Sequence, residues 1–265
     1  MDITIENCSS PGAHFSKNTN GVLLKIDEWI IEHNYPKLTF IEFRRNLEHD
    51  KGINDNNARN IYPLLKNSGL VEYQPRGDLN TKYFFTNRGK AYLETIKTIA
   101  LVKGLDYSKE KKEKAVQQLT EIMESIICDS VERILKNQDL NYSEGLRWYL
   151  EYLQEYGKIN KKEFAYMVYL MHSPDKENWK EKSKDIILAY RNKEIDINVS
   201  VRVRNDQKIK QVTQNTVRLE KIDFFTAYLY YSALINQTGI TRKLKDYYYL
   251  NESMHDKLIS LLEAE

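Results

Sequence analysis

The sequence is poor in cysteine and lacks any long apolar run. Its 265 residues include two cysteines, Cys8 and Cys128, which lie far apart and form no CxxC pair. They therefore predict neither a disulfide framework nor a cysteine metal site. No apolar stretch approaches the ~20 residues of a membrane-spanning helix, and the first ten residues lack the basic-then-apolar pattern of a signal peptide. We expect a reduced, cytoplasmic protein without a membrane partner.

Residues that break helices are also scarce, with ten glycines and five prolines in the whole chain. Hydrophobic residues make up 41% of the sequence, which is enough to bury a core and too much for intrinsic disorder. Together these features predict a mainly α-helical fold with small β-hairpins.

Neither sign of charge is in clear excess over the whole chain, since the net charge is only +2. The exception is residues 198–221, where six basic residues face two acidic ones, a local net charge of +4. Arg202 and Arg204 alternate there with valines, which predicts a strand with one apolar and one basic face. The local charge leaves a polyanion partner open.

Residues 20–99 give the clearest pattern of elements. Apolar residues at helical spacing predict a helix over 20–33, and Thr39 with Glu42 forms a capping-box pattern that starts a second helix. A third helix is expected from Asn54 or Asp55. Strands are expected over 70–73 and 82–85, followed by a helix that begins after Thr86. The order helix, helix, helix, hairpin, helix is that of a winged helix-turn-helix.

The rest of the chain predicts long helices and a second, shorter copy of this pattern. A helix is expected over 109–137, a second helix-turn-helix near 157–164, and a helix, hairpin and closing helix capped by Asn251 over 221–262. Residues 65–70 match 235–240, and 83–86 match 247–250. We expect three parts: an N-terminal arm, irregular over 1–19, with a winged-helix module (1–100), a helical connecting module (101–192), and a basic strand with a winged-helix-like module (193–265).

Asparagine, glutamine and arginine gather where this fold would meet DNA. Asn and Arg side chains pair with adenine and guanine edges, and the expected third helix begins with several of them. Basic residues of the hairpins and of the 198–221 segment suit phosphates. The candidate DNA-binding residues are Arg44, Arg45, Asn54, Asn56, Asn57, Arg59, Asn60, Arg76, Lys82, Arg202, Arg204, Lys208, Lys210, Gln211, Gln214, Arg242 and Lys243.

Catalytic signals are weak by comparison. The five histidines are scattered without metal-ligand spacing, and no GxGxxG, Walker A or GxSxG sequence is present. A metal-dependent nuclease needs clustered carboxylates and commonly a lysine. Only Asp196, Asp206 and Lys208 fit that pattern loosely. We therefore expect no metal site or cofactor in this chain, and leave open whether it is part of an enzyme.

Three stretches resemble the DNA-recognition region of type IIS restriction endonucleases. Residues 60–93 look like its winged module, residues 157–170 are similar to its middle-module helix, and residues 221–262 are similar to its terminal recognition module. Together they cover roughly a third of the chain. The resemblance implies tandem winged-helix modules that read a duplex, with cleavage and its Mg²⁺ supplied by a nuclease domain or subunit outside this sequence.

The sequence thus predicts sequence-specific binding of double-stranded DNA. A homodimeric transcription regulator would use the same modules on a palindromic site, and a plasmid or phage replication initiator would bind direct repeats. A complete metal-dependent nuclease and a protein-interaction platform are further alternatives.

Overall fold

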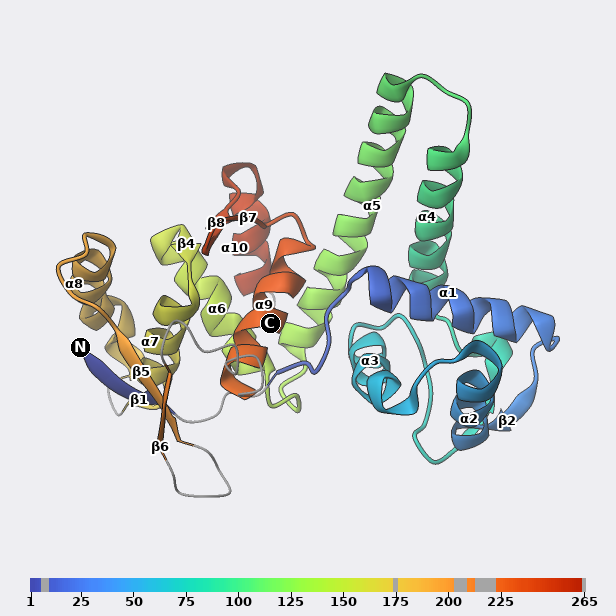
Figure 1. The fold of residues 1–265 in the computed structure, drawn as a ribbon, viewed down its shortest axis with the longest axis horizontal. Helices are drawn as coiled ribbons and strands as arrows, with labels where there is room; N and C mark the ends of the chain where they lie inside the picture. The colour runs from blue at the N-terminus through green and yellow to red at the C-terminus, as the bar shows by residue number, and fades with distance from the viewer. Residues whose placement is uncertain (6–9, 174–175, 203–208, 213–222, 264–265) are drawn as a thin grey trace. The chain divides into compact units, whose positions relative to one another are not determined.

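The computed structural model describes residues 1–5, 10–173, 176–202, 209–212 and 223–263 (Figure 1). Within these residues the chain is mainly helical with a few small strands, which confirms the mainly α part of the expected fold. It forms two compact units, one of Gly12–Ile134 and one of Met1–Pro11 with Leu135–Glu265. We call them the 12–134 unit and the 135–265 unit. The boundaries between these units lie after Pro11 and after Ile134, whereas the sequence suggested segment ends at residues 100 and 192.

The 12–134 unit is built on helices joined by short turns. Its elements are α1 (Lys17–Glu32), β2 (Lys37–Thr39), α2 (Phe40–Lys51), α3 (Asp55–Asn67), β3 (Asp78–Asn80), the 3-10 helix η1 (Thr81–Tyr83), α4 (Asn87–Gly104) and α5 (Lys109–Lys136), which extends just past the unit. The capping box of Thr39 and Glu42 is confirmed at the start of α2. Trp29 is 1% exposed, packs edge-on against Phe43, and donates from Nε1 to Asp50 at 2.7 Å, which ties α1 to α2.

The hairpin expected between residues 70–73 and 82–85 is reduced to a single bridge, and the regular strand pairing of this unit involves other residues. β2 pairs antiparallel with β3, and Val71 and Phe85 form a single bridge. The prediction of a strand over 82–85 was wrong, because Thr81–Tyr83 form the 3-10 helix η1. The Asn80 side chain accepts from the Lys82 amide at 3.2 Å, and the Thr81 hydroxyl donates to the Pro36 carbonyl at 2.9 Å. Such local hydrogen bonds compete with strand pairing.

The 135–265 unit combines helices with two small sheets. Its elements are β1 (Asp2–Ile5), α6 (Ser143–Tyr156), β4 (Lys158–Ile159), α7 (Lys161–Met171), the 3-10 helix η2 (Lys176–Asn178), α8 (Trp179–Arg191), β5 (Asn198–Arg202), β6 (Ile209–Val212), α9 (Asp223–Asn236), β7 (Thr241–Leu244), β8 (Tyr247–Leu250), the 3-10 helix η4 (Glu252–Met254) and α10 (His255–Glu263). One sheet has the order β1-β5-β6 and the other β4-β8-β7.

The first residues are not the irregular arm that the sequence predicted. β1 pairs in parallel with β5, with Asp2 opposite Asn198, and Ile3 and Ile5 are 3% and 1% exposed. The arm therefore begins in the 135–265 unit. The pattern was missed because only two apolar residues alternate there, and a parallel partner so distant in sequence leaves no local signal.

Each of the two units contains one copy of the same order of elements. In each, a helix, a short strand and a second helix precede a third helix and a pair of antiparallel chain segments, and the 135–265 unit inserts α8, β5 and β6 before its third helix. The third helices, α3 and α9, end alike. Gly69 and Gly239 have φ of 72° and 77°, and the Ser68 and Thr238 hydroxyls donate back to the equivalent carbonyls of Leu65 and Ile235 at 3.1 and 2.7 Å.

Backbone pairing after these helices fixes how the two copies align. Thr86 donates its amide to the Leu70 carbonyl at 3.1 Å, and Asn251 does the same to Ile240 at 2.8 Å. Thr86 is therefore equivalent to Asn251. The match of 65–70 with 235–240 is consistent with this, whereas the expected match of 83–86 with 247–250 is off by one residue. Asn251 also does not cap a helix through its side chain, which donates instead to the Gly239 carbonyl at 3.3 Å.

Candidate nucleic-acid interface

A tight turn between α2 and α3 precedes a polar helix start in the 12–134 unit. Gly52, at φ 62°, ends α2 in the left-handed conformation that glycine adopts without strain. Ile53 is 6% exposed and anchors the chain just before α3 begins at Asp55. Asn54 and Asn60 remain exposed on either side of the first turn.

One acidic residue at this helix start is shared by two arginines. Arg44 Nε and Nη2 each donate to the Asp55 carboxylate at 2.6 Å, and Arg59 Nε donates to it at 3.1 Å. Partial burial alone would raise the pKa of Asp55, but the two guanidinium groups hold that pKa below its usual value. The Glu48 carboxylate also lies at this helix start, where it accepts from the Asp55 amide at 3.3 Å, so two carboxylates balance the two arginines.

The two arginines of this cluster differ in what they can still reach. The Arg44 side chain is 24% exposed and joins α2 to α3, whereas Arg59 is 63% exposed. The sequence suggested Arg44 as a phosphate contact, and the structure shows a bidentate intramolecular partner that the sequence pattern did not reveal. The contact of Arg59 with Asp55 engages only Nε, and the Arg59 side chain is mostly exposed.

Five further candidates of this unit have exposed side chains. Asn56 and Asn57 lie in the first turn of α3. Arg45 is exposed on α2, and Asn54 and Asn60 are exposed before and after the first turn of α3. Arg76 is exposed at the tip of the 71–85 segment, and Lys82 is exposed in η1. The fold therefore brings Asn54, Arg59 and Asn60 together at one helix end, while Arg76 and Lys82 belong to a separate loop.

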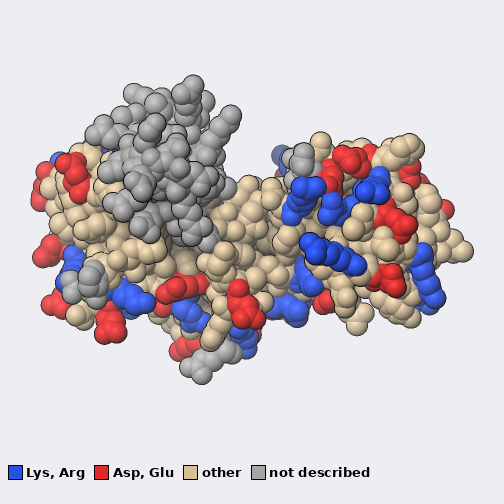
Figure 2. Space-filling view, turned by 90° about the horizontal axis from the view of Figure 1, so that it is seen from below, with Lys and Arg blue, Asp and Glu red and all other residues tan. Residues whose placement is uncertain are grey.

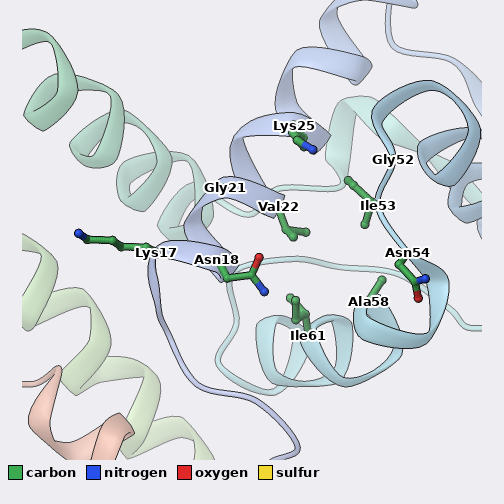
Figure 3. A pocket seen from close by; sticks show the side chains of 10 residues that line it. All are labelled: Lys17, Asn18, Gly21, Val22, Lys25, Gly52, Ile53, Asn54, Ala58 and Ile61. Atoms are coloured by element: carbon green, nitrogen blue, oxygen red, sulfur yellow. The ribbon is translucent and has the colours of Figure 1, made fainter.

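A hollow of about 230 Å³ lies beside the start of α3 (Figure 3). Its floor is apolar and its rim is polar and basic, and no acidic residue lines it; the lining residues are Lys17, Asn18, Gly21, Val22, Lys25, Gly52, Ile53, Asn54, Ala58 and Ile61. Figure 3 shows the Asn18 carboxamide pointing into the hollow. Lys25 Nζ donates to the Lys51 carbonyl at 2.9 Å, which holds that ammonium group near the end of α2.

Sequence reasoning missed Lys17, Asn18 and Lys25 as neighbours of α3. The first helix was expected from residue 20, but it begins at Lys17 because the Ser16 side chain accepts from the Thr19 amide at 3.2 Å. The apposition of α1 and the start of α3 is a long-range contact. A Ser at the N-cap position was the one local signal that could have moved the helix start.

The charges of this face are mixed. Figure 2 shows lysine and arginine side chains interspersed with acidic ones over the part of the molecule that contains α2 and α3. A uniformly basic surface would favour binding to any polyanion, whereas a mixed one depends on particular side chains. The arrangement therefore favours selective contacts over general electrostatic attraction.

The hairpin of the 135–265 unit carries the remaining described candidates. β7 and β8 are joined by a two-residue turn, with Arg242 opposite Tyr249 and Lys243 opposite Tyr248. Lys243 Nζ lies 5.7 Å from the Tyr248 ring centroid. Lys158 of β4, which sequence reasoning missed, lies 4.8 Å and 5.6 Å from the ring centroids of Tyr247 and Tyr249. Cations and aromatic rings are thus interleaved on this sheet.

Candidates from the basic 198–221 segment are described only in part. Arg202 lies in β5, and Lys210 and Gln211 lie in β6, with Arg202 paired to Ile209 and Lys210 to Val201. Arg204, Lys208 and Gln214 lie outside the described residues. The expected strand is therefore present as β5.

The candidate nuclease residues are not assembled into a described site. Asp196 forms an ion pair with Lys162, which lowers the pKa of this carboxyl, and it also accepts from the Ile197 amide at 2.9 Å. Asp206 and Lys208 lie outside the described residues. Among the residues that the structure describes, no group of three or more His, Cys, Asp or Glu side chains could hold a metal ion.

Comparison of the chain with protein-family models, curated proteins and solved structures gave no match. In the described part of the chain, none of the helices has the length and apolar character needed to cross a membrane.

Proposed function

We propose that the protein binds double-stranded DNA sequence-specifically and that the start of α3 reads the major groove. The observation that carries this proposal is the exposed set of Asn54, Arg59 and Asn60, which lie just before and in the second turn of a helix that follows a tight turn. Asn and Arg make the bidentate contacts that distinguish adenine and guanine. Backbone amides at a helix start add attraction for nearby phosphates.

The order of elements supports this assignment. A helix, a strand, two helices with a tight turn between them, and a pair of antiparallel segments follow the element order of a winged helix-turn-helix, in which the third helix enters the groove. Arg76 and Lys82 then sit where a wing would touch phosphates. We propose the same architecture for both repeats, which makes the protein a tandem winged-helix protein.

The two repeats differ in their third helix, and this difference favours α3 as the reading element. α3 has an amphipathic pattern with a polar first turn, whereas α9 is largely buried over residues 227–236. Tyr231 and Leu234 are fully buried, and Tyr149 donates to Ser232 at 3.0 Å inside the core. The 135–265 unit would then contact DNA through its β4-β8-β7 sheet, at Lys158, Arg242 and Lys243.

We further propose that this is the target-recognition part of a type IIS-like restriction endonuclease, with cleavage supplied by another domain or subunit. The support is the resemblance of residues 60–93, 157–170 and 221–262 to that family. The pairing of Asp196 with Lys162 supports a structural role for this carboxylate over a catalytic one.

The experiment is duplex binding by wild type, Arg59→Ala and Asn60→Ala on a site selected from random sequence. A lost bidentate base contact costs about 1–3 kcal/mol, roughly 5- to 150-fold in Kd, and relaxes preference at one position. Lys184→Ala, an exposed charge on α8, is the control and should leave Kd unchanged. Equal losses for all three variants would contradict a reading role for α3.

A homodimeric transcription regulator is the second candidate. It is favoured by an uncovered pair of helices in the 12–134 unit, the distal parts of α4 and α5, whose apolar side chains remain exposed or half-buried. A regulator of this kind would select a palindrome, whereas type IIS recognition would select an asymmetric site.

A further inference from the structure

Arg59 is tied to the first turn of its own helix. Its Nε atom donates to the Asp55 carboxylate at 3.1 Å, across one turn of α3. Residues four apart share one face of a helix, and helical side chains lean toward the N-terminus of their helix. The contact therefore draws the Arg59 guanidinium toward the helix start, where Asn54 is also exposed.

Asp55 is itself held from the neighbouring helix. Arg44 of α2 donates to both of its carboxylate oxygens at 2.6 Å, and one of these oxygens, Oδ2, also accepts from Arg59. The Arg44 and Asp55 side chains are only 24% and 20% exposed. A bidentate pair of arginine and carboxylate adds geometric specificity to its strength. Arg44 thus anchors the group that holds Arg59.

The contact leaves one edge of the Arg59 guanidinium for a ligand. Among the described residues, Nε is the engaged nitrogen of Arg59, and Nη1 and Nη2 donate to no protein atom. These two nitrogens form a planar fork that matches two acceptors side by side. In the major groove guanine offers such a pair, O6 and N7, whereas adenine sets a donor beside its acceptor. Cytosine presents a donor and thymine a single acceptor beside a methyl group, so the fork fits guanine best.

We propose that Arg59 reads a guanine and that Asp55 is its positioning residue. The inference rests on the proposed duplex binding by α3, and it adds which base this side chain selects and what orients it. A long side chain loses rotamer freedom when it binds, which costs affinity. Asp55 reduces that cost, because it restrains the guanidinium before the base arrives. Water screens this exposed contact in the free protein, but a base edge excludes the water and strengthens it.

Asp55 has a second effect, of opposite sign, on binding to DNA of any sequence. Asp55 and Glu48 balance the charges of Arg44 and Arg59 at this helix start. A carboxylate near phosphates opposes the attraction that drives non-specific binding. Loss of the Asp55 charge should therefore raise the affinity for random duplex while it lowers the preference for guanine. If Asp55 served the fold alone, its loss would lower both.

The test measures Kd for the site that wild type selects, for versions with each other base at the position that depends on Arg59, and for random duplex. Wild type should prefer guanine there by about 5- to 150-fold, the range for one bidentate pair, and Arg59→Ala should abolish the preference. Asp55→Asn should reduce it by about 2- to 10-fold, the ordering cost of one long side chain, and should tighten binding to random duplex. The double variant of Asp55→Asn and Arg59→Ala should show no preference beyond that of Arg59→Ala, because Asp55 acts through Arg59.

Asp106→Asn is the matched control. It makes the same substitution at an exposed acidic residue of the same unit, in the turn between α4 and α5, which lies away from α3 in Figure 1. Its base preference and its affinity for random duplex should both match those of wild type.

Three results would overturn the inference and leave duplex reading by α3 in place. They are a base other than guanine at the position that depends on Arg59, an unchanged preference for guanine in Asp55→Asn, and an equal loss of affinity for the selected site and for random duplex in Asp55→Asn. A motif that Arg59→Ala leaves unaffected would instead contradict the proposed function, and this inference with it.

Discussion

Replacing Arg44 by alanine should destabilise the protein, whereas replacing Arg59 should not. Both arginines donate to Asp55, but Arg44 does so with two hydrogen bonds of 2.6 Å in a partly buried pair, and Arg59 with one of 3.1 Å from an exposed side chain. In Arg44→Ala the Asp55 carboxylate keeps only Arg59. The junction of α2 and α3 loses its main polar contact.

The magnitude follows from the exposure of the pair. Removing one partner of a fully buried ion pair costs about 3–5 kcal/mol, and an exposed pair contributes about 0–1 kcal/mol. Arg44 and Asp55 are 24% and 20% exposed, so we expect about 2 kcal/mol for Arg44→Ala. For Arg59→Ala we expect less than ~0.5 kcal/mol, as for other i,i+4 pairs on a helix surface.

Urea unfolding as a function of pH tests this reasoning. The folded pKa of Asp55 is lowered, so its contribution is present above the usual carboxyl pKa of 3.8 and is lost as pH falls through the folded value. The difference between wild type and Arg44→Ala should therefore be full at pH 7 and shrink below pH 3.8. Equal stability of Arg44→Ala and Arg59→Ala at pH 7, or a difference independent of pH, would refute the assigned role of Arg44.

Other predictions concern packing and the second unit. Gly89→Ala should destabilise the fold by about 1–3 kcal/mol in urea unfolding, because a Cβ there would lie 1.9 Å from the Leu70 carbonyl oxygen. Gly21→Ala is the control and should be neutral or stabilising, because no atom lies near the added Cβ. Glu163→Ala should cost about 3 kcal/mol or more in the same assay, because Glu163 is fully buried against Arg191 at 2.7 Å. A change below ~1 kcal/mol in either Gly89→Ala or Glu163→Ala would contradict this packing.

Local signals in the sequence predicted the helices well. The capping box at Thr39, the long helix from residue 109, and the β7–β8 hairpin all appear in the structure. Each of these depends on spacing and turn chemistry within a few residues. Such signals do not depend on what the rest of the chain does.

Long-range pairing was the part that the sequence could not supply. β1 was missed because its partner, β5, lies almost 200 residues away, and η1 replaced an expected strand because Thr81 bonds to Pro36. The same limit applies to the candidate interface. Composition identified Asn54, Arg59 and Asn60, but the engagement of Arg44 with Asp55 and the position of Lys25 beside α3 follow only from the fold.

The central claim, sequence-specific duplex binding through α3, is tested most directly by selecting from a randomised duplex pool at about 150 mM salt, with and without Mg²⁺, and sequencing bound and cut molecules. We predict one enriched motif without cutting, asymmetric if the protein is a type IIS-like recognition part and palindromic if it is a dimeric regulator. The motif should be lost or relaxed at one position in Arg59→Ala. No enrichment with wild type, or enrichment unchanged in Arg59→Ala and Asn60→Ala, would contradict the claim.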